Sequence, residues 1–230
     1  MIVQLWSWSS LAALLALFGL AGPAAPPAGA AASASEQSPA AHFAPPQLVG
    51  REDEFCRRAY RIMMRGSRFL SDLYREWPTE PNCGYLGWGG SGEKEIYGNL
   101  GFAYLYALLL PFGAFDDTIA GVTRQEAQRR VVGVIRYAAF THFSGPHTCT
   151  DGRQWGGGWH GASWSSVFAQ LVWFTWDELD AETRQLAARV IVAEADRFIG
   201  VTPPSGKIDN TRAEDNAWNS RAMAVACVML

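Results

Sequence analysis

The sequence predicts an all-α protein, and three observations carry this prediction. Apolar residues recur at helical spacing, and no segment shows the alternation typical of a β-strand. Amphipathic segments rich in Arg and Glu alternate with segments that are apolar on nearly every side. The stretch "TRQEAQRRVV" at Thr123 is echoed by "TRQLAARVIV" at Thr183. Repeats that each span one helical hairpin indicate a stacked or ring-closed array of hairpins.

Six helices are expected. The amphipathic helices should face solvent and span residues 51–76, 123–140 and 180–199. The apolar helices should be buried and span residues 98–110, 162–176 and 211–230. The apolar set contains a second echo, between "SWSS" at Ser163 and "AWNS" at Ala217. Chance similarity between amphipathic helices is the alternative to a true repeat.

The N-terminal region predicts an exported leader. Residues 2–20 are apolar, and Ala32-Ser33-Ala34 has the small residues of a signal-peptidase site. We therefore expect residues 1–34 to be a signal peptide of a secreted or periplasmic protein. No Lys or Arg precedes Arg51, and the apolar run nearly reaches the ~20 residues of a membrane span, so an uncleaved anchor is the alternative. A Pro/Ala-rich linker, 35–50, then leads to one helical domain, 51–230.

The composition narrows the range of binding partners that the protein is expected to have. The net charge of −3 gives no sign of a nucleic-acid or anionic-membrane partner, so a membrane is expected only if the leader is an anchor. The four cysteines lack zinc-type spacing. Cys83 and Cys149 lie in loop-like stretches and are the most favourable disulfide pair, whereas Cys227 is expected to be a buried thiol on an apolar helix.

Long loops rich in Gly and Trp precede the apolar helices, and we expect them to gather at one end of the array, where binding and catalysis are usual. His160, in "WGGGWHGASW", has three tryptophan neighbours there: Trp155, Trp159 and Trp164. It suits a general base or a hydrogen-bonding group for a sugar. The alternative is a loop histidine satisfied by the backbone.

The first loop offers Trp88 and then Tyr97 and Asn99, in "EKEIYGNLG", just before the first apolar helix. A phenol at Tyr97 could deliver or remove a proton, although a buried tyrosine with one satisfied hydroxyl is the commoner case.

The last apolar helix begins with "DNTRAEDNAWNS". A capping box from Thr211 to Glu214 explains part of this stretch. It does not explain Asn216, Trp218 and Asn219, because amides are poor helix residues unless their side chains have partners. These amides should either bond to neighbouring loops or point into a ligand cavity.

A metal is not expected. His142, His147, Cys149 and Asp151 are close in sequence, but their spacing matches no established metal motif. Signatures of nucleotide-binding loops, serine hydrolases and HExxH metalloproteases are also missing from the sequence. We therefore expect no cofactor.

The alternating helices, the Trp/Gly loops and the polar groups at the helix entrances resemble the α/α-toroid carbohydrate-active proteins, in particular heparinase II/III-like polysaccharide lyases. The resemblance implies an aromatic-lined cleft and β-elimination on a uronate-containing glycan. It implies catalytic roles for His160, Asn216, Asn219, Tyr97 and Glu214, and substrate contacts from Trp155, Trp159, Trp164, Trp218, Asn99 and Trp88.

The chain departs from that family in two ways: it is short, and its last helix has no C-terminal cap. Three hairpins make about half of a six-hairpin ring, and the last helix ends in "VACVML" without a cap. We therefore expect an incomplete toroid, truncated at its C-terminus. Two other functions stay open. One is glycoside hydrolysis by two carboxylates among Asp151, Asp209 and Glu214, and the other is glycan binding or scaffolding without chemistry.

Overall fold

The computed structural model describes residues 54–112, 115–158, 160–199 and 213–230, and this part of the chain is mostly helical. The all-α prediction is confirmed. The expected leader and linker lie outside the described residues. Seven α-helices are present in the described ranges: α1 Glu54–Ser71, α2 Glu93–Phe112, α3 Asp117–Ala120, α4 Arg124–Thr141, α5 Gly161–Thr175, α6 Ala181–Asp196 and α7 Ala213–Met229. A short 3₁₀ turn, Trp176–Glu178, and two strands, β1 Tyr74–Glu76 and β2 Gly84–Leu86, complete the set.

The helix starts follow from local capping. The Thr123 hydroxyl accepts a hydrogen bond from the Glu126 N–H at 3.1 Å and so begins α4. Asp180 begins α6 in the same way, accepting from the Thr183 N–H at 2.7 Å. Thr123 is thus a cap, whereas its echo Thr183 is the third residue of its helix. The two similar stretches therefore begin at different positions in their helices, because Asp180 takes the capping role in α6.

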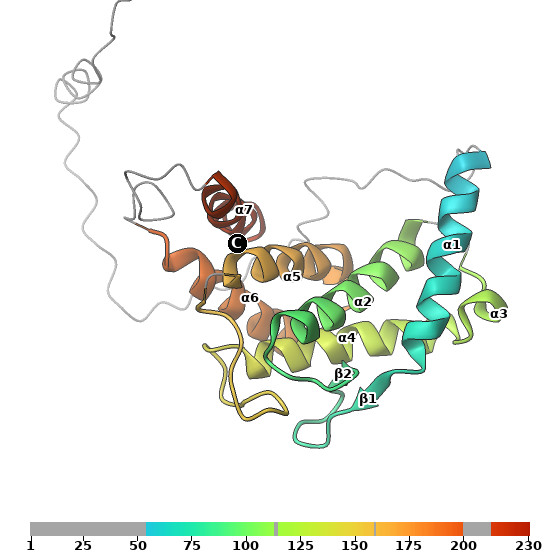
Figure 1. The fold of residues 1–230 in the computed structure, drawn as a ribbon, viewed down its shortest axis with the longest axis horizontal. Coiled ribbons are helices and arrows are strands. Elements are labelled where there is room, and N and C mark those ends of the chain that lie inside the picture. The colour runs from blue at the N-terminus through green and yellow to red at the C-terminus, as the bar shows by residue number, and fades with distance from the viewer. Residues whose placement is uncertain (1–53, 113–114, 159, 200–212) are drawn as a thin grey trace, which may run out of the picture. The chain divides into compact units, whose positions relative to one another are not determined.

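The helices form two layers (Figure 1). In one layer α5 packs between α2 and α7, and in the other α4 packs on α6. Two contacts fix the direction of α2 and α5: Tyr97 meets Ser163 near the start of both helices, and Tyr104 meets Gln170 further along both. Helices α2 and α5 therefore run parallel. Arg124, at the start of α4, donates a hydrogen bond to the Leu110 carbonyl near the end of α2, so α4 begins beside the end of α2.

The core lies between these layers. Its largest fully buried side chains come from α2, α4, α5 and the loop before α5, and include Phe102, Tyr106, Tyr137, Trp155 and Phe168. This matches the nearly all-apolar character of α2 and α5, since a helix buried on every side needs no polar face. Helix α1 contacts α2 and α3 and lies at one edge of the array, while α7 contacts α5 and α6 at the other.

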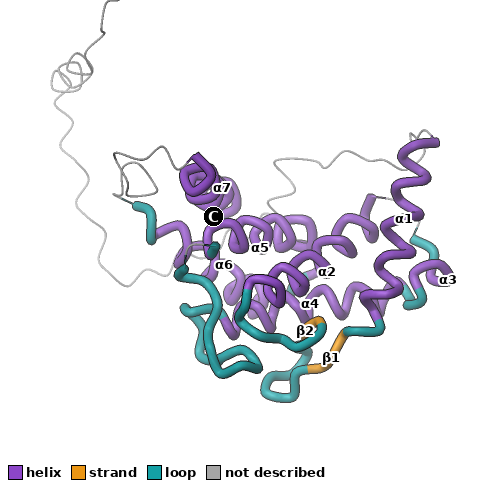
Figure 2. The backbone as a smooth tube through the Cα atoms, viewed as in Figure 1, coloured by secondary structure: helices purple, strands orange, loops and turns teal. Residues whose placement is uncertain are grey.

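A small hairpin interrupts the expected first helix. Instead of continuing to residue 76, α1 ends at Ser71, and β1 pairs antiparallel with β2, with Tyr74 opposite Leu86. The Tyr74 ring packs where Gly133 of α4 leaves room, because a Cβ there would lie 2.5 Å from the Tyr74 hydroxyl oxygen. Figure 2 shows the hairpin on the same side as the long loops. In the described residues no helix is long and apolar enough to cross a membrane.

The cysteine predictions are wrong. None of the four cysteines, all of which lie in the described residues, forms a disulfide, so Cys83 and Cys149 are not paired. Both are buried, and burial raises the pKa of the Cys83 thiol to about 11, while Arg136 nearby opposes this shift. Cys227 is exposed rather than buried, because α7 is covered by α5 and α6 on one face only.

Candidate functional site

Two of the predicted loops are joined directly. Asp151, in the loop before α5, accepts hydrogen bonds from the Ser91 N–H at 3.0 Å and the Ser91 hydroxyl at 2.8 Å. The Thr150 N–H donates to the Gly89 carbonyl at 3.0 Å. Desolvation raises the pKa of Asp151, but the hydrogen bonds from Ser91 and from the Arg153 N–H outweigh it, so the net pKa is lowered and the carboxylate is ionised. These contacts hold the loop before α2 against the loop before α5.

A buried polar network fixes the glycine stretch before His160. Glu194 of α6 is fully buried and lies 3.1 Å from His142 Nε2. It also accepts a hydrogen bond from the Gly157 N–H at 2.8 Å and pairs with Arg197. Gly156 has a φ of +84°, and a Cβ on it would lie 2.4 Å from His142 Nε2. The glycines therefore let the chain turn tightly over this network.

The protonation of that network follows from its hydrogen bonds. The Ser144 N–H donates to His142 Nδ1 at 3.2 Å, so Nε2 carries the proton and donates to Glu194. Burial lowers the pKa of His142. Burial alone would raise the pKa of Glu194, but the hydrogen bonds from His142 and Gly157 and the charge of Arg197 lower it. Neutral His142 and ionised Glu194 are therefore the stable forms near neutral pH.

Four predicted site residues meet where the N-terminal ends of α2, α5 and α7 come together. We call Tyr97, His160, Trp164 and Trp218 the aromatic cluster. The ring centroid of His160 lies 5.6 Å from that of Trp164 and 5.7 Å from that of Trp218. Tyr97 packs edge-on against Trp164, with the centroids 6.0 Å apart. Residues far apart in sequence thus form one group of ring contacts, in which Trp164 is buried at the centre.

Polar side chains lie next to the aromatic cluster. Glu93, the first residue of α2, has a carboxylate oxygen 3.7 Å from His160 Nδ1. The Tyr97 hydroxyl is hydrogen-bonded to the Ser163 hydroxyl at 3.0 Å, and Tyr97 is 39% exposed. A carboxylate beside Nδ1 favours the tautomer with the proton on that nitrogen, and in this tautomer Nε2 carries the lone pair. The arrangement holds an accessible base beside an accessible phenol.

Two predicted site residues have structural roles instead. Trp155 is fully buried, and its indole N–H donates to the Ala138 carbonyl at 2.7 Å, so its ring has no free face for a sugar. Asn99 is also buried; its amide donates to the Glu95 carbonyl at 2.9 Å and its oxygen accepts from the Leu86 N–H. These bonds fasten β2 to α2. Trp159 lies outside the described residues.

The predicted site residues of helix α7 lie in different environments. Its buried seam runs through Asp215, Ala222 and Met229, at a spacing of seven residues. Asn219 is buried beside this seam, Asn216 is half-buried and Glu214 is exposed. Trp218 reaches His160 from the other side of the seam. Trp218 therefore joins α7 to the aromatic cluster.

Trp88 lies at the same end of the molecule as the aromatic cluster. It lies in the loop before α2, between Gly87 and Gly89, both of which have positive φ, and its side chain is 83% exposed. The Thr150 hydroxyl donates to the Trp88 carbonyl, which ties the loop down. An exposed indole on an anchored loop can stack on a flat ligand face.

The four residues that lie close together in sequence and were considered as metal ligands have different surroundings in the structure. His142 pairs with Glu194, whereas His147 lies 2.8 Å from a Glu80 oxygen. Cys149 is buried, and Asp151 binds Ser91. Across the described ranges no three His, Cys, Asp or Glu side chains come together in a metal-binding group.

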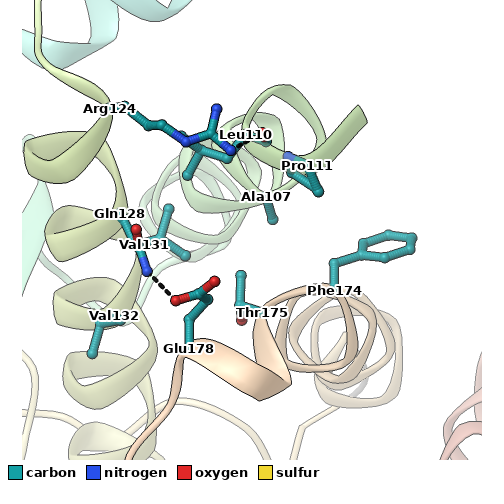
Figure 3. Close-up of a pocket in the computed structure, with 10 residues that line it drawn as sticks. All are labelled: Ala107, Leu110, Pro111, Arg124, Gln128, Val131, Val132, Phe174, Thr175 and Glu178. Atoms are coloured by element: carbon teal, nitrogen blue, oxygen red, sulfur yellow. Dashed lines mark hydrogen bonds between the residues drawn. The ribbon is translucent and has the colours of Figure 1, made fainter. Parts of the chain in front are cut away.

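A small pocket lies at the other end of the helices. Figure 3 shows its walls, which enclose about 110 Å³ between the C-terminal ends of α2 and α5 and the first half of α4. Gln128 donates to Glu178 across one side. The lining residues are Ala107, Leu110, Pro111, Arg124, Gln128, Val131, Val132, Phe174, Thr175 and Glu178. None of them belongs to the aromatic cluster.

Sequence reasoning missed Glu93, Ser163 and Glu194. Glu93 sits in a helix that begins five residues earlier than expected, so it had seemed part of a loop. Glu194 lies in an amphipathic helix and looked like a solvent-facing acid. The one sequence feature that could have indicated a paired Glu194 was Arg197, three residues further along the chain.

Comparison with known proteins does not assign the chain to a family. No protein-family model, curated protein or solved structure matches this chain.

Proposed function

We propose that this protein is a carbohydrate-active protein, and specifically a polysaccharide lyase acting on a uronate-containing glycan. The observation that carries the proposal is the convergence of Tyr97, His160, Trp164 and Trp218 from three helices into one cluster. Sugar rings have flat apolar faces that pack on indoles, and their hydroxyls need polar partners at the same place. The cluster offers both within one surface.

The fold supports the same proposal at the level of architecture. Parallel α2 and α5 in one layer, backed by α4 and α6 in the other, have the alternation of an α/α toroid. We propose that the two layers are an arc of such a toroid in an exported protein, with the aromatic cluster at the end where the loops gather. The export signal proposed for residues 1–34 rests on their sequence alone.

In the proposed reaction His160 Nε2 removes the C5 proton of the uronate. The electron pair of that C–H bond forms the C4–C5 double bond, and the bond from C4 to the glycosidic oxygen breaks. The Tyr97 phenol, held by Ser163 at 3.0 Å, protonates the leaving oxygen. The amides of Asn216 and Asn219 are assigned to the uronate carboxylate, whose charge must be neutralised before C5 becomes acidic. Trp88 and Trp218 are assigned to the sugar faces, whereas Trp164 is buried and contacts Tyr97 and His160 from the core.

Glycoside hydrolysis has less support. Asp151 is held ionised by Ser91 and Arg153, which suits a base but not an acid. Glu214 is exposed on α7, and no contact joins it to Asp151 in the described residues. Asp209 lies outside those residues. A binding function without chemistry is the second candidate, because the exposed Trp88 needs no proton transfer to hold a glycan.

The test is an elimination assay on a panel of uronate polysaccharides, followed by the ultraviolet absorbance of unsaturated uronate ends. The wild-type chain should produce this absorbance. His160→Ala and Tyr97→Phe should each lower the rate by at least about 100-fold, the usual contribution of one acid–base group. His147→Gln is the matched control, since His147 pairs with Glu80 outside the cluster. Glycan binding without product in the wild type would favour the second candidate.

A further inference from the structure

Helix α1 carries a row of exposed apolar side chains. Phe55, Ile62 and Phe69 are 78%, 69% and 68% exposed. They are seven residues apart, so they lie within about 40° of one another around the helix. The row runs along almost the full length of the helix. Large apolar groups this exposed, in line on one element, mark a surface that contacts something apolar.

Arginines accompany this row. Helix α1 has five, Arg57, Arg58, Arg61, Arg65 and Arg68, against one acidic residue, Glu54. Arg57 and Arg58 pair with Glu54, whereas Arg61, Arg65 and Arg68 form no ion pair within the described residues. At about 100° per residue, Arg58 and Arg65 border the apolar row, and Arg61 and Arg68 follow beside them. The net charge of −3 for the whole chain conceals this local positive strip.

The other side of the helix is already occupied. Met64, Ser67 and Ser71 are buried there, and α1 contacts α2 and α3. The helix therefore cannot insert into a groove that would surround it. It presents one fixed face at the edge of the array, as Figure 1 shows. A partner for this face must be flat, apolar beneath and negatively charged at its surface.

We infer that α1 docks on a lipid bilayer with anionic headgroups. A helix with an apolar row and flanking basic residues lies in the interface, with its apolar side chains among the acyl chains and its cations at the headgroups. Charge complementarity argues against a second copy of the chain as the occupant. An antiparallel symmetric contact between two α1 helices would bring the two arginine strips together on one side of the interface. This inference does not depend on the proposed lyase activity.

The test is co-sedimentation of the full-length chain with vesicles of phosphatidylcholine alone or mixed with phosphatidylglycerol. Binding should require phosphatidylglycerol and should weaken as salt is raised. Arg61→Gln/Arg65→Gln/Arg68→Gln should weaken it by on the order of 100-fold, given the contribution of each basic residue near an anionic surface. Ile62→Ser/Phe69→Ser should weaken it at every salt concentration. Circular dichroism checks that each variant keeps its helices.

The matched control is Arg75→Gln/Arg153→Gln/Arg221→Gln, which removes the same charge from exposed sites outside α1. It should bind vesicles nearly as the wild type does. Vesicle binding that ignores both phosphatidylglycerol and the α1 arginines would overturn the inference and would assign membrane contact to another segment, such as residues 2–20. Concentration-dependent dimers that Ile62→Ser/Phe69→Ser abolishes, without vesicle binding, would overturn it in favour of a second copy.

Discussion

His160 Nδ1 lies 3.7 Å from a carboxylate oxygen of Glu93, although the two residues begin different helices. The contact is possible because α2 and α5 run parallel, so their first turns lie side by side. It gives the proposed base a neighbour that sets its tautomer, as a carboxylate does for a catalytic histidine in general. Glu93 is thus a positioning residue for His160.

We predict that Glu93→Gln lowers kcat by on the order of tenfold while leaving KM nearly unchanged, because the amide no longer fixes the tautomer by charge. Glu95→Gln is the control, since Glu95 lies two residues further along α2 and projects about 200° away from Glu93 around the helix. Equal losses in both variants, measured by steady-state kinetics, would remove the assigned role of Glu93.

The buried network around Glu194 should contribute strongly to stability. We predict that Glu194→Ala lowers the free energy of unfolding by about 3–5 kcal/mol, because it leaves His142, Arg197 and the Gly157 N–H without their shared partner. Asp196→Ala removes an exposed acid from the same helix and should change it by less than about 0.5 kcal/mol. Urea unfolding measures both, and a similar small change in each would contradict the network's role.

Stability should also fall as the solution is acidified. The pKa of His142 is lowered in the folded protein, so the unfolded chain binds a proton more readily as the pH falls below about 6.5. The lowered pKa of Glu194 adds a similar loss as the pH falls below its ordinary value near 4.5. We predict that His142→Gln removes most of the slope of unfolding free energy against pH between 7 and 5. A slope that survives this substitution would show that other groups cause it.

Thiol labelling checks the cysteine environments. Cys56 and Cys227 are exposed and should react with a thiol reagent in the native protein, whereas buried Cys83 and Cys149 should react only after unfolding. The raised pKa of Cys83, about 11, adds to its protection. Mass spectrometry after unfolding without a reductant should therefore find four labelled thiols per chain. Only two would indicate the Cys83–Cys149 disulfide that the structure lacks.

Much of the fold could be predicted from the sequence, because the core is made by helix faces. The spans of α4, α5, α6 and α7 were expected to within about three residues, since apolar periodicity and caps such as Thr123 act locally. The β1–β2 hairpin was missed because strands of three residues carry almost no alternation. The start of α2 was missed because Gly98 and Gly101 weaken its local helix signal.

The candidate site was predictable in part. Tyr97, His160, Trp164 and Trp218 stood out as aromatic or ionisable residues at helix entrances. Which tryptophans remain accessible depended on packing: Trp155 and Trp164, on either side of the glycine stretch, are both buried, whereas Trp88 is 83% exposed. The Glu93–His160 contact depended on the parallel packing of α2 and α5, which no local pattern specifies.

The most direct test of the central claim, that a glycan occupies the aromatic cluster, is calorimetric titration of uronate oligosaccharides into wild-type, Trp218→Ala and Trp173→Ala chains. Trp173 packs on Phe174 near the far end of α5 and is the control. The account predicts that Trp218→Ala weakens binding by about tenfold, the equivalent of about 1.4 kcal/mol, while Trp173→Ala binds as the wild type does. Binding that Trp218→Ala leaves unchanged would contradict the account.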